Sequence, residues 1–186
     1  MRTARLLCLV AVLLLTSTWV WAASPPQAGD AFPEQALQAP QSEKERAYLG
    51  LGPEVEQFRL QDLKAPVIVV EIFSMYCPYC QREAPEVNAL FQRIQEEGLG
   101  DSIKMLGIGP GNSAYEVGIF RDKFSVPFPL FPDRDYTWHK VVGEVGTPYF
   151  FVLERDGDQL RVRISHLGPF ESPEAFWNRI LKATHL

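Results

Sequence analysis

The sequence VIVVEIF, residues 67–73, constrains the fold of this chain more than any other stretch. It is a continuous apolar, mostly β-branched run with one acid, Glu71, and such runs are typical of central strands covered on both faces. Cys77 and Cys80 follow shortly after it, at the start of a helical pattern that extends to Glu97. The sequence therefore predicts a buried strand that leads two cysteines to the N-terminus of a helix.

The rest of the chain alternates between strand and helix patterns. Further strands are predicted at residues 103–109, 149–153 and 160–164, and further helices at residues 113–124, 135–142 and 172–181. The Pro-rich sequence VPFPLFP, residues 126–132, is interpreted as a break between two elements. This order of elements predicts an α/β fold.

Residues 1–22 have the pattern of a signal peptide. A basic start precedes an apolar run at residues 6–15, and Ala22 is a small residue of the kind that a signal peptidase needs. The run is short for a membrane span, although an uncleaved membrane anchor is the alternative. We therefore expect cleavage after Ala22, loss of Cys8 with the signal, and export, with the bacterial periplasm as the expected location.

Composition separates a lead-in from the main domain. Residues 23–47 are rich in Pro, Gln and Ala and lack periodicity, which predicts a flexible lead-in with one short strand near Phe32, and residues 48–186 are predicted to form one domain. Loss of Arg2 and Arg5 would lower the basic count from 18 to 16 against 23 acids, so the formal charge would change from -5 to -7. Such an acidic protein is not expected to bind nucleic acid. A monomer is expected, because no oligomerisation helix is evident.

The two neighbouring cysteines are predicted to be redox-active. They would be the only cysteines of the exported chain, in an oxidising compartment where thiols can cycle. Unpaired N–H groups and the helix dipole stabilise a thiolate at Cys77, and Cys80 lies one turn further on, within reach of a disulfide. Cys77 would attack a substrate disulfide and Cys80 would resolve the mixed disulfide. No cofactor is expected, because the dithiol itself carries the electrons.

Other interpretations of the cysteine pair stay open. A structural disulfide that closes so small a loop would stabilise the fold only weakly. A metal site would need more ligands, and His139, His166 and His185 are scattered along the chain, so no metal site is predicted. A copper carrier that uses two thiolates and a histidine, and a binding protein with inert cysteines, are the remaining alternatives.

The strand, the C-P-Y-C sequence and the later sequence VGTPYFFVLERDG together resemble the thioredoxin superfamily, from about Tyr48 to the C-terminus. The chain is most similar to exported proteins of the TlpA/ResA type. Two stretches carry that similarity: FRLQDLKAPVIVVEIF, and IKMLGIGPGNSAYEVGIFRDKF, which is similar to a redoxin or AhpC/TSA-like insertion. The resemblance implies a thioredoxin-like fold, in which helices flank a central mixed sheet, with an N-terminal extension and a central strand-helix insertion.

The resemblance also implies an activity and its partners. The expected activity is thiol-disulfide exchange with protein disulfides or dithiols, with the protein as reductant and a membrane or periplasmic redox partner supplying electrons. Thr147 and Pro148 match the family's cis-proline loop, which offers backbone to a bound substrate chain, and an ordinary strand-entry proline is the alternative. Tyr79 and Tyr149 could form an exposed apolar rim that grips substrate.

Two acids are expected near the dithiol. Glu71 matches a buried acid of the family, and burial within VIVVEIF should raise its pKa and let it accept the proton of Cys80 through water. A salt-bridged core acid is the alternative for Glu71. Glu83 matches an acid that ResA-type proteins place near the site, although a solvated helix face is equally consistent with its position.

Several positions depart from the TlpA/ResA pattern. Tyr76 replaces the thioredoxin Trp, and Pro78-Tyr79 is more like glutaredoxins and disulfide isomerases. The sequence EIFSMYCPYC also resembles DsbA-type oxidases, which leaves the redox direction open, with a DsbA-like or isomerase-like oxidant as the alternative. A thiol peroxidase is a further alternative, since Ser74 occupies the hydroxyl position of the peroxiredoxin motif, but Val70 stands where that motif has proline.

Overall fold

The computed structural model describes residues 24–186. The predicted signal peptide, its cleavage after Ala22 and the loss of Cys8 therefore lie outside the described residues. Among residues 24–186, none of the helices combines the length and the hydropathy that a bilayer-spanning helix needs.

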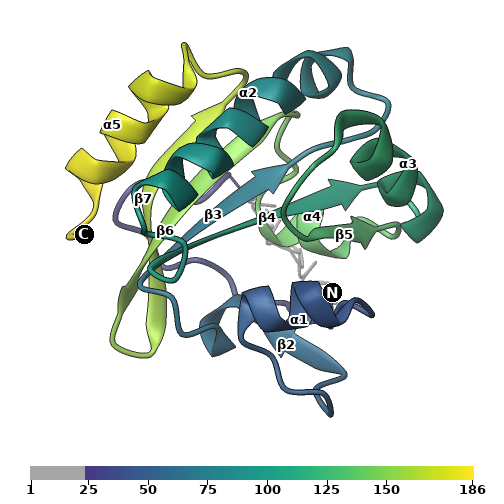
Figure 1. Ribbon diagram of the computed structural model, residues 1–186, viewed down its shortest axis with the longest axis horizontal. Coiled ribbons are helices and arrows are strands. Elements are labelled where there is room, and N and C mark those ends of the chain that lie inside the picture. Colours follow the sequence, from purple (N-terminus) through teal and green to yellow (C-terminus); the bar gives the residue numbers. More distant parts are fainter. Residues whose placement is uncertain (1–23) are drawn as a thin grey trace, which may run out of the picture.

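A five-stranded mixed sheet forms the centre of the molecule (Figure 1). In spatial order its strands are β5 (Leu130–Asp133), β4 (Ile103–Pro110), β3 (Val67–Ile72), β6 (Tyr149–Asp156) and β7 (Gln159–Leu167). β4 runs parallel to β3 and β5, whereas β6 runs antiparallel to β3 and β7. The predicted strand at residues 67–73 is thus the middle strand, and the predicted mixed sheet is confirmed.

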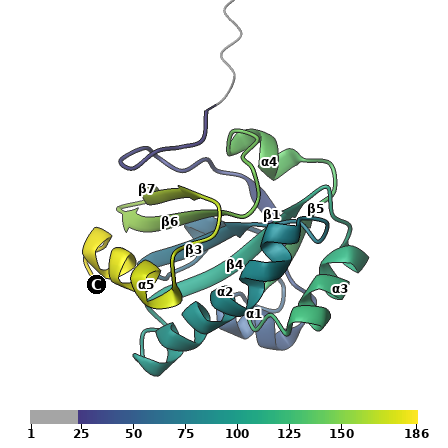
Figure 2. The ribbon, with the colours of Figure 1, turned by 90° about the horizontal axis from the view of Figure 1, so that it is seen from above.

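Helices and the N-terminal segment cover the two faces of this sheet (Figure 2). The helices are α1 (Glu43–Leu49), α2 (Pro78–Glu96), α3 (Ala114–Phe124), α4 (Thr137–Val141) and α5 (Pro173–Ala183). α2, α3 and α5 pack on one face, while α4 and the N-terminal segment (residues 32–63) pack on the other. Side chains alternate along β3, so Glu71 shares the face of Val69 and Phe73 and points toward α2.

Helix α2, which carries Cys80 and follows Cys77, begins where the sequence predicts. Cys77 is the N-cap residue, with extended backbone angles, and Pro78 occupies the first helical turn, where its missing N–H costs no hydrogen bond. Its apolar stripe, which includes Val87, Leu90 and Ile94, is buried against the sheet. The helix therefore presents its N-terminus, with both cysteines, at the carboxyl end of β3.

The expected flexible lead-in instead has regular structure. β1 (Ala36–Gln38) pairs antiparallel with β2 (Gln57–Arg59), and Ser42 caps helix α1, so the boundary predicted at residue 48 cuts through a helix. Phe32, expected in a short strand, lies next to an isolated bridge and is buried. Periodicity did not predict this segment because its few apolar side chains bury individually against the sheet.

The Pro-rich stretch at residues 126–132 contains most of strand β5 (Leu130–Asp133), which the sequence did not predict. β5 is an edge strand that pairs only with β4, and Pro132 lies opposite Gly109 in that pairing. An edge strand tolerates proline, because one side of its backbone needs no partner within the sheet. The stretch does end helix α3 at Phe124, as predicted, but it also contributes an edge strand that the sequence did not reveal.

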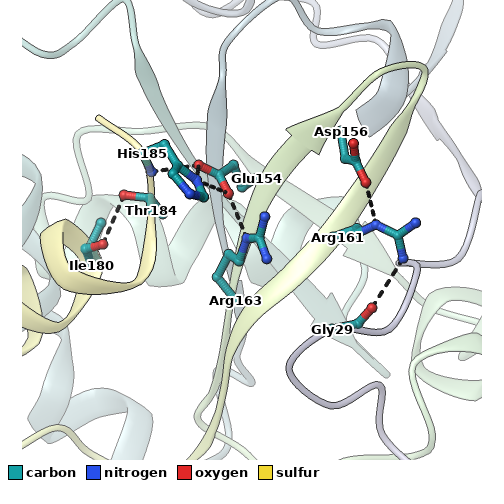
Figure 3. A network of polar contacts seen from close by, with 8 residues as sticks. All are labelled: Gly29, Glu154, Asp156, Arg161, Arg163, Ile180, Thr184 and His185. Atoms are coloured by element: carbon teal, nitrogen blue, oxygen red, sulfur yellow. Dashed lines mark hydrogen bonds and ion pairs between the residues drawn. The ribbon is translucent and has the colours of Figure 1, made fainter.

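Glu154 joins the sheet to the C-terminal residues (Figure 3). It is only 7% exposed, and its carboxylate accepts hydrogen bonds from Arg163 Nε at 2.6 Å and from the His185 backbone N–H at 2.6 Å. The His185 ring Nδ1 lies 2.9 Å from the same carboxylate. Burial raises the pKa of Glu154, but these donors outweigh burial and lower the pKa below that of an ordinary glutamate.

We predict that Glu154→Gln lowers the free energy of unfolding at pH 7 by about 1–3 kcal/mol, because buried donors lose a charged acceptor. The folded-state pKa of Glu154 is lowered, so its contribution is complete above the unfolded-state pKa of about 4.3 and is lost as pH falls through the folded-state pKa. Urea unfolding at pH 7 and at pH 3 should therefore show a deficit that shrinks in acid.

Asp156→Asn is the matched control on the same strand. Asp156 pairs with Arg161 at the exposed end of the hairpin, where an ion pair contributes little (Figure 3). We expect no measurable change for this control, and equal deficits in the two variants would contradict the role of Glu154.

Candidate active site

Cys77 is the accessible thiol of the pair. Its Sγ accepts a hydrogen bond from the Cys80 amide at 3.4 Å and lies 3.2 Å from the Thr147 carbonyl oxygen. Partial burial raises the pKa of Cys77, and a carbonyl neighbour also favours the neutral thiol. Donors around the sulfur, among them the Cys80 amide at the start of α2, outweigh these effects and hold the pKa of Cys77 below that of an ordinary cysteine. Cys77 is therefore suited to be the attacking thiolate.

Cys80 has the opposite electrostatic environment. Its side chain is fully buried, and burial raises its pKa far above that of an ordinary cysteine. The Ser74 backbone N–H partly offsets this effect, while the charges of Glu71 and Cys77 add to it. Cys80 therefore stays protonated unless a base removes its proton.

Glu71 lies beneath the two cysteines, as the strand alternation requires. It is 3% exposed, which confirms the prediction of burial, and within residues 24–186 its Oε1 has no hydrogen-bond partner. Burial raises the pKa of Glu71 to about 8, and the charges of Glu83 and Cys77 contribute to the shift. In the described part of the chain Glu71 makes no ion pair, so the alternative of a salt-bridged core acid receives no support.

Glu83 is buried rather than solvated. It is 6% exposed, and its Oε1 accepts a hydrogen bond at 3.0 Å from the backbone N–H of Phe170, in the segment before α5. Burial raises its pKa, the Phe170 bond lowers it, and the charge of Glu86 raises it further. Two acids with raised pKa values therefore lie on the buried side of α2: Glu83 on the helix itself and Glu71 on strand β3 beneath it.

The loop at Thr147-Pro148 lies against Cys77. The peptide bond between these residues is cis, as predicted, and the Thr147 carbonyl contacts Cys77 Sγ. The Pro148 carbonyl accepts a hydrogen bond from the Gly168 N–H at 2.8 Å, which ties the loop to the end of β7. The fold thus brings together Thr147 and Cys77, which are far apart in the sequence.

The predicted aromatic rim is only half correct. Tyr79 is 57% exposed, with the Arg82 guanidinium 4.6 Å from its ring centre. Tyr149 is 6% exposed and its hydroxyl lies 2.7 Å from Ser165 Oγ, so its predicted place in the rim is wrong. It belongs to β6, where alternation directs it to the sheet face opposite α2. Tyr76 is 64% exposed instead, and its hydroxyl donates a hydrogen bond to the Glu116 carboxylate.

Sequence reasoning missed the role of Asn112, which it used only to locate the start of a helix. The side chain is fully buried, its Oδ1 accepts a hydrogen bond from the Met75 N–H at 2.8 Å, and its Nδ2 donates to Ser74 Oγ at 3.3 Å. Only the position of Asn112 in the sequence could have indicated this role. It follows the predicted strand at residues 103–109, which pairs in the sheet with the strand that leads to Cys77.

We predict that Glu71→Gln stabilises the protein increasingly as pH rises from about 5 to 8. The folded-state pKa of Glu71 is raised, so the unfolded chain releases this proton first, and wild-type stability falls as pH rises through that window. Urea unfolding of both proteins at pH 5 and pH 8 measures the difference. Glu96→Gln, an exposed glutamate at the end of helix α2, is the control and should show no such trend. A Glu71→Gln difference that is constant with pH would contradict the raised pKa.

Comparisons with known proteins agree with this geometry. Residues 28–159 match the model of the AhpC/TSA family, a range that includes most of the segment interpreted as a lead-in. The thiol-disulfide oxidoreductase ResA of Geobacillus thermodenitrificans is 25% identical over 104 residues, which are 56% of this chain and 58% of that relative. The chain thus covers less than two thirds of the length of this curated relative.

Solved structures show the same fold at low sequence identity. A Chlorobium tepidum protein described as a candidate thiol:disulfide interchange protein DsbE superimposes with a TM-score of 0.64 at 19% identity, over 85% of this chain and 98% of that chain. A secreted Mycobacterium tuberculosis disulfide oxidoreductase, described as homologous to E. coli DsbE, gives a TM-score of 0.53 at 16% identity, over 68% of this chain and 89% of that chain. The chain therefore belongs to the AhpC/TSA family and has a thioredoxin-like fold.

Proposed function

We propose that this protein is an exported thiol-disulfide oxidoreductase that reduces disulfides of other proteins through Cys77 and Cys80. The observation that carries the proposal is the contrast between the two thiols: the pKa of the accessible one is lowered, and the pKa of the buried one is raised. Nucleophile and resolving thiol need this contrast, because only one of them should be a thiolate before substrate binds. The names of the relatives, ResA and DsbE, support the same activity.

In the first step the Cys77 thiolate attacks one sulfur of a substrate disulfide. A bond forms between Cys77 Sγ and that sulfur, the substrate S–S bond breaks, and the other substrate sulfur leaves as a thiolate. The Thr147-Pro148 loop borders Cys77 and would hold the substrate backbone, and the exposed rings of Tyr76 and Tyr79 would contact its side chains.

In the second step Cys80 loses its proton and attacks Cys77 Sγ. The intramolecular disulfide forms, the mixed disulfide breaks, and the second substrate sulfur leaves as a thiolate, so two electrons pass from the dithiol to the substrate. Glu71 would accept the proton through water. The charge of Cys77 helps to raise the pKa of Glu71 in the reduced protein, and the mixed disulfide removes that charge. The pKa of Glu71 then falls at the stage where a base is needed.

The proposal also covers cofactor, partners, oligomeric state and location. No cofactor is needed, because electrons enter and leave through the same dithiol. A membrane or periplasmic partner would return the protein to its reduced form, and a monomer with no nucleic-acid partner is expected. Export rests on the pattern of residues 1–22 and on one structural neighbour that is described as secreted.

The alternatives differ in what supports them. The lowered pKa of Cys77 is also compatible with a DsbA-like oxidant, because a stabilised thiolate makes a dithiol more oxidising. For a peroxidase, the Ser74 hydroxyl would have to serve the cysteine, but it bonds to the Tyr76 amide and to Asn112. For a copper carrier, no group of three or more potential ligands occurs among residues 24–186.

We predict that Cys77→Ser abolishes disulfide exchange, whereas Cys80→Ser accumulates a mixed disulfide with an added protein disulfide. Glu71→Gln should slow the second step at pH 7 by roughly ten- to a hundredfold and alter its pH profile, because the buried base is lost. Stopped-flow measurement of mixed-disulfide decay tests this, with Glu96→Gln as control. An unchanged pH profile in Glu71→Gln would show that Glu71 is not the base.

The redox direction is testable by the reduction potential of the Cys77-Cys80 couple in a glutathione or dithiothreitol buffer. We expect a value near that of thioredoxin, about -270 mV, which suits a reductant. A value near that of DsbA, about -120 mV, would instead identify an oxidant that inserts disulfides.

A further inference from the structure

The backbone of Ser74 contacts both members of the dithiol. Its carbonyl accepts a hydrogen bond from the Cys77 N–H at 3.0 Å, and its N–H favours the ionised form of Cys80. The first contact closes the turn that leads into α2, and the second lowers the otherwise raised pKa of the buried thiol. The position of Ser74 therefore affects the surroundings of both sulfurs at once.

Asn112 holds this turn from the neighbouring loop between β4 and α3. Its Nδ2 donates to Ser74 Oγ at 3.3 Å, and its Oδ1 accepts from the Met75 N–H at 2.8 Å. The Ser74 hydroxyl also accepts a hydrogen bond from the Tyr76 N–H at 3.3 Å. An amide is suited to this position, because it supplies a donor to the hydroxyl and an acceptor to the backbone N–H without a charge.

The loop that carries Asn112 is itself fixed. The Gly111 N–H donates to the Asp133 carbonyl at 2.9 Å, and the Asn112 N–H donates to the Gly109 carbonyl at 3.1 Å. Gly111 has a φ of +68°, which favours glycine, and a Cβ at Gly109 would lie 3.2 Å from Asn112 Oδ1. The side chain of Asn112 is fully buried, so a lost hydrogen bond there cannot be replaced easily by solvent.

We propose that Asn112 is a positioning residue for the dithiol: by holding Ser74 and Met75, it keeps Cys77 Sγ at the helix N-terminus, where its thiolate is stabilised. The inference rests on the proposed exchange activity and adds to it a residue from the loop between β4 and α3. A second contact, from the Tyr76 hydroxyl to Glu116 in the first turn of α3, joins the same region at the surface.

The test is Asn112→Ala, with Asn88→Ala as a matched control. Asn88 also connects the α2 region to α3, since its Nδ2 donates to the Phe124 carbonyl at 2.8 Å, but it does so at the other end of α3. Both variants lose a side-chain amide that bridges these regions, and only one of them loses contact with the turn before Cys77. Urea unfolding reports the loss of stability in each variant.

Two readouts separate positioning from stability. We expect Asn112→Ala to react with iodoacetamide at Cys77 about three- to tenfold more slowly at pH 7, because less of the thiol is ionised. We also expect its dithiol-disulfide equilibrium with glutathione to shift up to about tenfold toward the oxidised form, or ~30 mV to a more negative potential. Asn88→Ala should match wild type in both measurements, whatever stability it loses.

Each outcome decides the question. The proposal is overturned if folded Asn112→Ala has the same Cys77 titration and the same reduction potential as wild type. It is also overturned if Asn112→Ala and Asn88→Ala show equal shifts. If Asn112→Ala does not fold, Ser74→Ala replaces it, because Ser74→Ala removes only the hydroxyl that Asn112 holds. An unchanged rate of Cys77 alkylation in Ser74→Ala would overturn the proposal. Disulfide exchange by wild type is measured in parallel: if it is absent, the proposed function fails, while the titration of Cys77 still tests the positioning role.

Discussion

The burial of β3 on both faces is the constraint on which the rest of this structure depends. A strand with no solvent-exposed residue needs a layer on each side, and α2, α3 and α5 supply one layer while α4 and the N-terminal segment supply the other. The same burial forces Glu71 into the space beneath α2. Because α2 starts a few residues after β3 ends, the dithiol lies directly above the one acid that the strand contains.

The candidate site consists of titratable groups that the fold places in unequal environments. Cys77 lies at a helix N-terminus with donors around its sulfur, whereas Cys80 and Glu71 are surrounded by apolar side chains. Desolvation favours the neutral forms of Cys80 and Glu71, whereas hydrogen-bond donors favour the thiolate of Cys77. In the proposed exchange, charge moves from one sulfur to the other, and the effect of the Cys77 charge on the pKa of Glu71 would link the two steps.

Much of the fold was predictable, and the failures have identifiable causes. Strands and helices with a clear period were found within a few residues, as at β4, where residues 103–109 were predicted and Ile103–Pro110 form the strand. Strand β5 was not predicted because its proline is atypical of strands, although an edge strand tolerates it. The structure of the lead-in was not predicted because its buried apolar side chains follow no regular period. Tyr149 was misplaced because its neighbour in sequence, Pro148, lies at the site while its own side chain points to the other face.

Local periodicity and neighbouring residues were enough to predict the buried strand, the acid within it and the two cysteines at the start of a helix. Only the tertiary structure decided that the Thr147 carbonyl contacts Cys77, that Phe170 binds buried Glu83, and that Asn112 holds the turn before the dithiol. These contacts join segments that are remote along the chain, so their existence depends on how the layers pack, which no local pattern of residues encodes.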